Sequence, residues 1–467
     1  MKFLFNAGCR NAAAFTLVYW LLSPSLLAAP TGSADYSVHE GYRDVPMPEG
    51  FSVVINELDG PVFVNSEGKT LYQWPQKEHR NGYSGEPQGS PQCGDEVVRV
   101  TAGLMSPYPP GILLPELDTR PSCTDLWPPE FADEQAEEVG EWTLIERADG
   151  RHQWSYDEQA LYTSIRDVEP GDSIGGRKRR FGSGFGRDDP AYRIPLAPPQ
   201  NIPPGFAIQA TTIGRMLTTD KNEALYSFDQ DTASFTACEQ HCLHKWQPIF
   251  APALARSQGD WSILERSPGV RQWVFRGKPL YRYLPESRSW SQLGSDEQGW
   301  HNVFTQPAPA YPPSFTRQAT IVGEVLANAQ GHTIYLYFCA DDSEDQLACD
   351  HPLDTQVYRL AMCGGGDPDR CLQHWPYVLA SPDEHSINRT WTVLNIDPTT
   401  GRPVREQDLV STEYLRVWAY RDRPVYTYGI DKVPGDVHGG GIGEWRGQRN
   451  GLRAFWLRND FMSGILR

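Results

Sequence analysis

Short runs of β-branched and aromatic residues recur along the chain between turn residues. Such runs begin at Phe51, Trp142 and Gln153, and their length and composition are typical of strands. Asp149-Gly150 lies between the second run and the third, and this dipeptide favours a tight hairpin. Residues 236–246, around two cysteines, instead have a spacing that indicates one or two helical turns. We therefore expect a mainly β fold built of hairpins, with a short helical segment near the paired cysteines.

Aromatic residues repeat at matched intervals in three successive parts of the chain. A tyrosine follows an opening phenylalanine by 21, 20 and 20 positions, and later tryptophans and tyrosines keep comparable spacings. The matched residues are Tyr72, Tyr226, Tyr335, Trp127, Trp246, Trp375, Trp142, Trp261, Trp391, Trp154, Trp273, Trp418, Tyr162, Tyr281 and Tyr426. We interpret them as core residues of three tandem copies of one module, because large aromatic side chains dominate core burial.

Proline-rich stretches at residues 194–204 and 306–313 mark the joints between the copies, since such stretches favour extended spacers. Each of the three hairpin-rich modules is long enough to bury a core of its own. The expected organisation is a signal peptide (1–29), an N-terminal linker (30–45), module 1 (46–193), module 2 with its Pro-rich leader (194–305), and module 3 with its Pro-rich leader and insertions (306–467).

The first residues are organised like a secretory signal. Lys2 and Arg10 make a basic start, residues 12–22 an apolar stretch, and residues 27–29 a small-residue end. The apolar stretch is too short for a membrane span, so we expect a periplasmic or secreted protein that is soluble after signal cleavage. Its formal net charge of −17 disfavours nucleic acid and anionic membrane surfaces as partners, because like charges repel.

The cysteines predict disulfides. Cys9 lies in the signal, and the remaining eight divide two, two and four among the copies. An even number in every module of an exported chain indicates bonds formed within modules, with connectivity left open. The candidates are Cys93, Cys123, Cys238, Cys242, Cys339, Cys349, Cys363 and Cys371.

Two acidic turns have the residue types of a calcium site. Asp167 and Asp172, and likewise Asp431 and Asp436, lie five positions apart around a Pro-Gly turn. Calcium prefers several oxygen ligands on a folded loop, and these carboxylates could supply some of them. The alternative is that each aspartate caps its turn by accepting hydrogen bonds from nearby backbone N–H groups. Otherwise we expect no cofactor.

The tyrosine segments carry a shared motif. Residues 226–231 and 426–431 follow the pattern Tyr-x-aromatic-x-x-Asp, and residues 281–286 differ only in ending with Glu. Together with Cys-x-x-x-Trp-Pro-Pro at residues 123–129, this pattern resembles a bacterial secreted repeat family, the predicted lipoproteins with a Yx(FWY)xxD motif. The resemblance covers nearly all of residues 46–460 as three tandem copies. It implies a repeat fold and no particular activity, because that family is described as being of unknown function.

Three positions depart from the family pattern. Lys77 and Ala340 replace the acid, and Ser164 replaces the aromatic residue. A catalytic acid would not be expected to vary in this way among copies in one chain. The lipid anchor that the family name implies is not carried over, because no cysteine follows the signal in the position that lipidation requires.

No catalytic motif is present, since the chain has no Gly-x-Ser-x-Gly, no phosphate-binding Gly-x-x-x-x-Gly-Lys-Ser/Thr loop and no His-Glu-x-x-His. We therefore expect a non-enzymatic scaffold or binding protein for an unknown envelope or extracellular ligand. One alternative is a periplasmic redox-linked or metal-handling protein that uses Cys238 and Cys242 with His241 and His244. Another is polysaccharide binding through the unmatched tryptophans, which are Trp74, Trp290 and Trp456.

Overall fold

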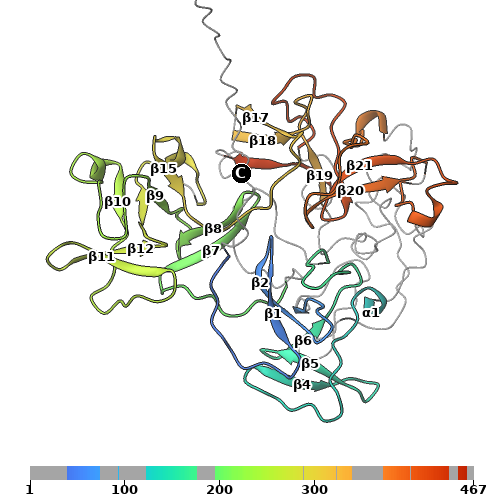
Figure 1. The fold of residues 1–467 in the computed structure, drawn as a ribbon, viewed down its shortest axis with the longest axis horizontal. Helices are drawn as coiled ribbons and strands as arrows, with labels where there is room; N and C mark the ends of the chain where they lie inside the picture. The colour runs from blue at the N-terminus through green and yellow to red at the C-terminus, as the bar shows by residue number, and fades with distance from the viewer. Residues whose placement is uncertain are drawn as a thin grey trace, which may run out of the picture.

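The computed structural model describes residues 39–73, 93, 123–175, 195–287, 289–321, 323–338, 372–399, 401–440 and 451–459. The expected signal peptide, Trp74, Lys77, Ala340 and the cysteines Cys339, Cys349, Cys363 and Cys371 lie outside the described residues. The prediction of a mainly β fold is confirmed, because the described chain forms many small antiparallel sheets (Figure 1). None of the helices in this part of the chain is long and apolar enough to span a membrane.

The strands are short throughout. Up to residue 200 they are β1 (Ser52–Asn56), β2 (Gly60–Val64), β3 (Tyr72–Gln73), β4 (Trp142–Glu146), β5 (His152–Tyr156) and β6 (Gln159–Tyr162), with the helical turn α1 (Cys123–Leu126). From 201 to 310 they are β7 (Phe206–Thr211), β8 (Gly214–Thr219), β9 (Tyr226–Phe228), β10 (Trp246–Pro248), β11 (Trp261–Ser267), β12 (Val270–Phe275), β13 (Lys278–Pro279), β14 (Tyr281–Tyr283), β15 (Trp300–Asn302) and β16 (Phe304–Pro307), with the 3₁₀ turns η1 (Cys242–His244) and η2 (Leu293–Asp296). Beyond 310 they are β17 (Thr316–Thr320), β18 (Gly323–Ala327), β19 (Tyr335–Phe338), β20 (Trp391–Ile396), β21 (Leu415–Tyr420), β22 (Arg423–Pro424), β23 (Gly451–Ala454) and β24 (Trp456–Asn459), with η3 (Glu406–Asp408).

We call residues 39–200, 201–310 and 311–459 the first, second and third segments. Each begins with an antiparallel hairpin, formed by β1 and β2, by β7 and β8, and by β17 and β18. In each hairpin the second strand starts at a glycine with positive φ, a conformation that other residues rarely adopt. The short connection before that glycine is called the hairpin tip below. In Figure 1 the hairpins β1–β2 and β7–β8 lie toward the middle of the molecule, and β17–β18 lies in its upper part.

Turn residues decide where the remaining hairpins form. Asp149-Gly150 does connect β4 to β5, as predicted, and Gly150 has a φ of 80°. The next turn, Asp157-Glu158, joins β5 to β6 with φ values of 48° and 61° although neither residue is glycine. In region 236–246 the helical turn is limited to η1. Residues 236–238 stay in a loop because Thr236 Oγ1 accepts the Cys238 N–H at 3.1 Å.

The core consists of six buried apolar clusters, two in each segment, among the residues the structure describes. Every one of the fifteen matched tyrosines and tryptophans is at most 5% exposed. Edge-to-face contacts dominate, such as Phe63 against Trp142 with ring centroids 5.1 Å apart. Leu196 packs back on the first segment by exchanging backbone hydrogen bonds with Phe63 and Leu71. The start of the first proline-rich stretch is thus held by the sheet that precedes it.

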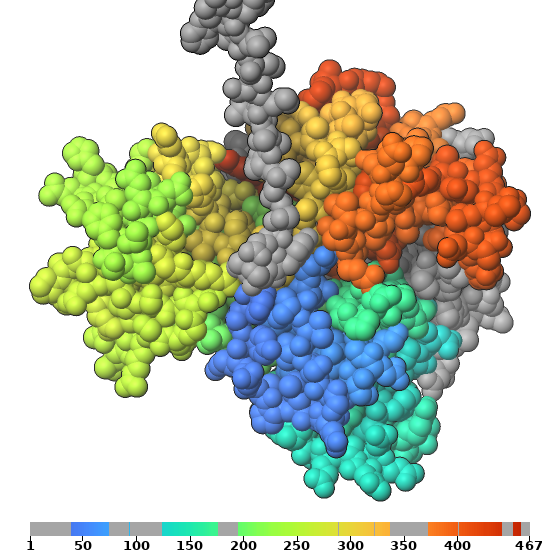
Figure 2. Space-filling model, viewed as in Figure 1, coloured from blue at the N-terminus to red at the C-terminus, as the bar shows by residue number. Residues whose placement is uncertain are grey.

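Polar contacts join each segment to both of the others. Figure 2 shows their surfaces in direct contact, with the orange third segment against the blue first segment. Gln306 Nε2 of the second segment donates to Asn56 O of the first at 2.7 Å. Arg458 Nη1 of the third segment donates to Asp296 Oδ1 of the second at 2.5 Å. Arg389 Nε of the third segment donates to Asp172 Oδ1 of the first at 3.0 Å. Apolar residues of two hairpin tips, Leu58 and Ile213, also pack against a core cluster of the third segment. The described chain is therefore held together as one body.

Candidate functional site

A buried tyrosine hydroxyl donates to a motif acid in all three segments. Tyr72 Oη donates to Asp167 Oδ2 at 2.5 Å, and Tyr335 Oη donates to Asp431 Oδ2 at 2.5 Å. In each case the acid lies five positions after the later tyrosine of its segment, and it pairs with the earlier tyrosine. Each of these hydrogen bonds joins a strand to a turn that lies far from it in sequence.

The second segment contains this exchange twice. Tyr226 Oη donates to Glu286, and Tyr281 Oη donates to Asp231 Oδ2 at 2.6 Å. The two motifs, 226–231 and 281–286, therefore each supply the acid that the other's tyrosine requires. Their strands β9 and β14 pair with Tyr226 opposite Tyr281, so the register places each acid near the other's hydroxyl.

The aromatic residue of the motif stacks on a core tryptophan. Tyr428 stacks on Trp375 with centroids 4.2 Å apart and planes 24° apart, and Phe228 stacks on Trp300 at 4.6 Å and 16°. In the first segment the corresponding residue is Ser164, and it is buried. Such offset stacking adds to the free energy gained by burying the rings.

A glycine follows Asp167, Glu286 and Asp431, though not Asp231, by eight positions, and close packing requires it. A β-carbon on Gly294 would lie 2.7 Å from ring atoms of Tyr226, and one on Gly439 would lie 2.6 Å from Trp375. A β-carbon on Gly175 would lie 2.1 Å from the Ser164 hydroxyl. The sequence shows these glycines at a constant interval from the acid, but without the structure they look like ordinary loop residues.

Burial controls the ionisation of the motif residues. It raises the pKa of Asp167 to about 7, and it raises the pKa of Tyr72 well above its ordinary value, where the nearby Asp167 charge adds to the effect. Burial likewise raises the pKa of Glu286. For Tyr281, burial and the hydrogen bond to Asp231 raise the pKa to about 12. These groups are enclosed in the core, so their arrangement fits hydrogen bonding within the fold better than proton exchange with a substrate.

The two acidic turns considered for calcium cap their own backbones. Asp172 Oδ2 accepts the N–H groups of Val168 and Glu169 at 3.1 and 2.8 Å. Its carboxylate also receives Arg389 from the third segment, at 3.0 Å for each of two nitrogens. The Asp167 carboxylate accepts the hydrogen bond from Tyr72 Oη. These contacts are the turn-capping arrangement that the sequence left open as the alternative.

The turn in the third segment has the same caps and a different neighbour. Asp436 Oδ2 accepts the N–H groups of Lys432 and Val433 at 2.8 and 3.0 Å. Asp431, Asp436 and His438 each place one potential metal ligand atom within 4.8 Å of the others. The imidazole Nδ1 of His438 already lies 3.1 Å from Asp431 Oδ1. Among the described residues, these three form the group whose ligand atoms lie close enough together to hold a cation.

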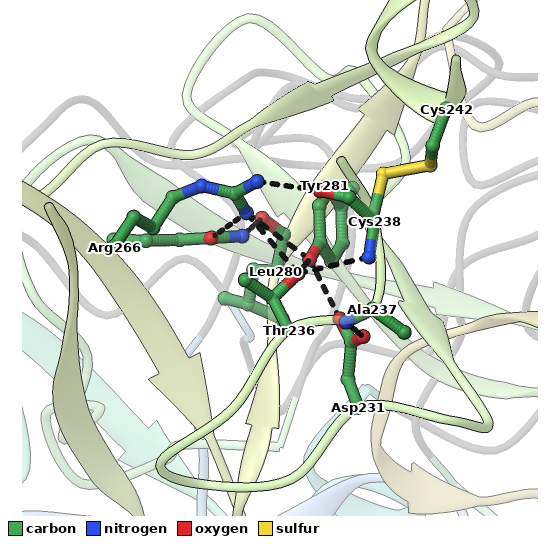
Figure 3. Close-up of a disulfide and its surroundings, with 9 residues drawn as sticks. Asp231, Thr236, Ala237, Cys238, Cys242, Arg266, Leu280 and Tyr281 are labelled. Carbon is green, nitrogen blue, oxygen red and sulfur yellow. Dashed lines mark hydrogen bonds between the residues drawn. A yellow bond between two sulfur atoms is a disulfide. The ribbon is translucent and has the colours of Figure 1, made fainter. Parts of the chain in front are cut away.

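The cysteine site of the second segment is a disulfide between Cys238 and Cys242 (Figure 3). Cys238 is completely buried, and Cys242 is half-buried at the start of η1. Arg266 Nη2 donates to the Cys238 carbonyl at 2.5 Å and Arg266 Nη1 donates to Gln272 Oε1 at 2.7 Å, which ties this loop to β12. Cys93, in the first segment, is also disulfide-bonded.

The other candidate residues lie at different places. His241 and His244 are exposed beside the disulfide, with ring centroids 6.4 Å apart. Trp290 packs against the core cluster around Tyr226, and its indole N–H has no partner among the described residues. Trp456 is half-buried in β24. The described tryptophans of the proposed sugar platform are therefore packed into two different segments.

No protein-family model, curated protein or solved structure matches the chain. The contacts described above are therefore the basis for a proposed function.

Proposed function

We propose that this chain is an exported, disulfide-stabilised scaffold that carries binding loops for an envelope or extracellular ligand and has no catalytic activity of its own. The observation that carries the proposal is the use of the motif acids. Asp167, Glu286 and Asp431 each accept a hydrogen bond from a core tyrosine. The chemical groups that recur along the chain thus serve its folding, which leaves the variable loops for binding.

Three copies of one module, in residues 46–193, 194–305 and 306–467, are part of this proposal. The support is the correspondence of contacts, since each segment has the opening hairpin, the tyrosine paired with an acid, and the close-packed glycine. Membership of the secreted repeat family with the Yx(FWY)xxD motif belongs to the same proposal. A signal peptide at 1–29 and a periplasmic or secreted location complete it.

Intact mass spectrometry of the exported protein tests the proposal, recorded native and denatured, with and without reduction and alkylation. We expect an N-terminus near residue 30, eight cysteines that alkylate only after reduction, and the same mass in native and denatured samples apart from solvent. Free thiols, or a native mass surplus that denaturation removes, would contradict the scaffold and direct attention to Cys242 and its histidines.

A second candidate is thiol–disulfide exchange at Cys238 and Cys242. The observation that favours it is the unequal burial of the two sulfur-bearing residues, because an attacking thiolate could reach Cys242 while Cys238 is enclosed. Exposed His241 and His244 would stabilise a thiolate once a dithiol donor had reduced the bond. Equilibration with glutathione buffers tests it, and a bond that stays oxidised over the whole range of such buffers would exclude it.

A further inference from the structure

The acidic turns of the first and third segments are built alike. In both, the second aspartate accepts two consecutive backbone N–H groups. In both, the glycine before that aspartate has positive φ, 76° at Gly171 and 88° at Gly435, and packs against the opening hairpin. The two turns therefore present the same kind of surface, formed by a hairpin tip and a capped aspartate.

The molecule itself shows how such a surface is bound. Arg389, from the third segment, places two nitrogens 3.0 Å from the two carboxylate oxygens of Asp172. Arg421 donates to the Ser173 carbonyl beside it. At the adjacent hairpin tip, Thr390 donates to Glu57 and Leu58 packs against the core cluster of the third segment. Paired guanidinium contacts to a carboxylate, next to an apolar contact, make a specific recognition geometry.

The corresponding surface of the third segment has no such partner within the described residues. Asp436 receives no arginine or lysine from that part of the chain, and the ammonium of neighbouring Lys432 is turned to the Gly429 carbonyl at 2.6 Å. Ile321, at the hairpin tip, is 94% exposed, and Val433 on the turn is 58% exposed. An exposed apolar pair beside a carboxylate is the counterpart of the contact that Arg389 and its neighbours make with the first segment.

We propose that Ile321, Val433 and Asp436 form a docking surface for an arginine-bearing segment of another protein. This inference rests on the proposed function, since it uses the correspondence of the first and third segments. The negative charge of the chain favours such a partner by electrostatic attraction. The pairing inside the molecule supplies the chemistry of the partner, an arginine followed by a hydroxyl residue and an apolar residue, as in residues 389–391.

A second copy of this chain is the less suitable occupant. Arg389, the third-segment residue that contacts the acidic turn of the first segment, is already bound to Asp172. The matching positions of the second and first segments, two residues before Trp261 and Trp142, are glycines. A copy would thus bring an engaged arginine or a glycine to Asp436.

The test is fluorescence anisotropy with a labelled peptide of residues 386–393, Ser-Ile-Asn-Arg-Thr-Trp-Thr-Val. We expect saturable binding to the full-length protein that weakens at least tenfold with Asp436→Asn, and at least tenfold when the peptide carries Arg389→Gln, because a charge-assisted pair is lost. Ile321→Ser should weaken binding severalfold. Matched variants elsewhere on the third segment, Asp408→Asn for charge and Val410→Ser for exposure, should change it less than twofold.

Several results would overturn the inference. These are an absence of saturation at millimolar peptide, equal binding of the Arg389→Gln peptide, or binding that survives Asp436→Asn, which would place the peptide at Asp172 instead. Self-association of the protein that Ile321→Ser abolishes would assign the surface to a second copy. Absent peptide binding together with eight blocked cysteines would overturn this inference alone, whereas free thiols in the native protein would contradict the proposed function.

Discussion

The guanidinium of Arg389 lies against the carboxylate of Asp172, with Nε and Nη2 each 3.0 Å from an oxygen although 217 residues separate the two in sequence. The aspartate side chain is 4% exposed and the arginine side chain is 53% exposed. A paired geometry with one partner buried distinguishes this contact from ordinary surface ion pairs. It connects the third segment to the first.

Arg389→Gln should therefore lower the stability of the whole chain. The substitution leaves Asp172 buried with only its backbone donors, and we expect a loss of about 1–2 kcal/mol, reduced from the value for a fully buried pair because the arginine is half exposed. Urea unfolding followed by tryptophan fluorescence checks this. Arg317→Gln, which removes a more exposed pair with Glu324, is the control and should cost less than about 1 kcal/mol. Equal effects of the two substitutions would refute a special role for Arg389.

Asp167 should make the protein lose stability as pH rises. Its pKa is near the ordinary value of 3.8 when unfolded and about 7 when folded, so the folded state binds more protons between these values. The stabilising contribution is fully present below about pH 4 and is lost as pH approaches and passes 7. Glu130, whose pKa burial also raises to about 7, adds to the same trend.

The difference between wild type and Asp167→Asn isolates the Asp167 contribution. Free energies of unfolding measured from pH 4 to pH 8 should fall less steeply in the variant, because the Asp167 contribution is removed while those of Glu130 and the other buried acids remain. Parallel curves for the two proteins would show that Asp167 does not ionise in this range.

Gly294→Ala should be strongly destabilising. The added β-carbon would lie 2.7 Å from Tyr226 and 2.8 Å from Trp246, and both rings are in the core. Overpacking of this kind costs about 1–3 kcal/mol, which thermal unfolding can detect. Gly41→Ala, where the nearest atom would be 3.8 Å away, should leave the melting temperature almost unchanged. A Gly294→Ala protein as stable as wild type would mean that the core around Tyr226 is looser than described.

Removing the disulfide of the second segment should have a moderate effect. Cys238 and Cys242 close a very short loop, with a sequence separation of 4, so cross-linking restricts the unfolded chain only slightly. We expect the double replacement with alanine to cost about 2 kcal/mol and to leave the fold intact by circular dichroism. Unfolding of the double variant at room temperature would instead show that this bond is essential.

Part of this structure could be predicted from local sequence alone. Asp149-Gly150 specifies its hairpin, and the regular intervals between aromatic residues such as Trp142 and Tyr226 indicate residues that prove to be buried. The turn at Asp157-Glu158 could not be predicted, because Glu158 has a positive φ that glutamate rarely adopts. The tertiary context imposes that conformation.

Hydrogen bonds between residues distant in sequence could not be predicted either. The spacing within a motif predicts that Glu286 follows Tyr281, but the hydroxyl that it accepts belongs to Tyr226, 60 residues earlier. Nothing in the local pattern identifies that partner, because pairing of β9 with β14 brings the two together. The contact of Arg389 with Asp172 was hidden for the same reason, since it depends on how whole segments pack.

The proposal that the motif serves folding is tested most directly by equilibrium urea unfolding of Tyr226→Phe, compared with wild type and with Tyr414→Phe, which changes a partly exposed tyrosine. We predict that Tyr226→Phe lowers the free energy of unfolding by about 1–3 kcal/mol, because Glu286 loses its buried donor, and that fluorescence and circular dichroism report one shared transition. The result that would contradict the account is an unchanged midpoint for Tyr226→Phe, equal to that of Tyr414→Phe, together with separate transitions for the segments.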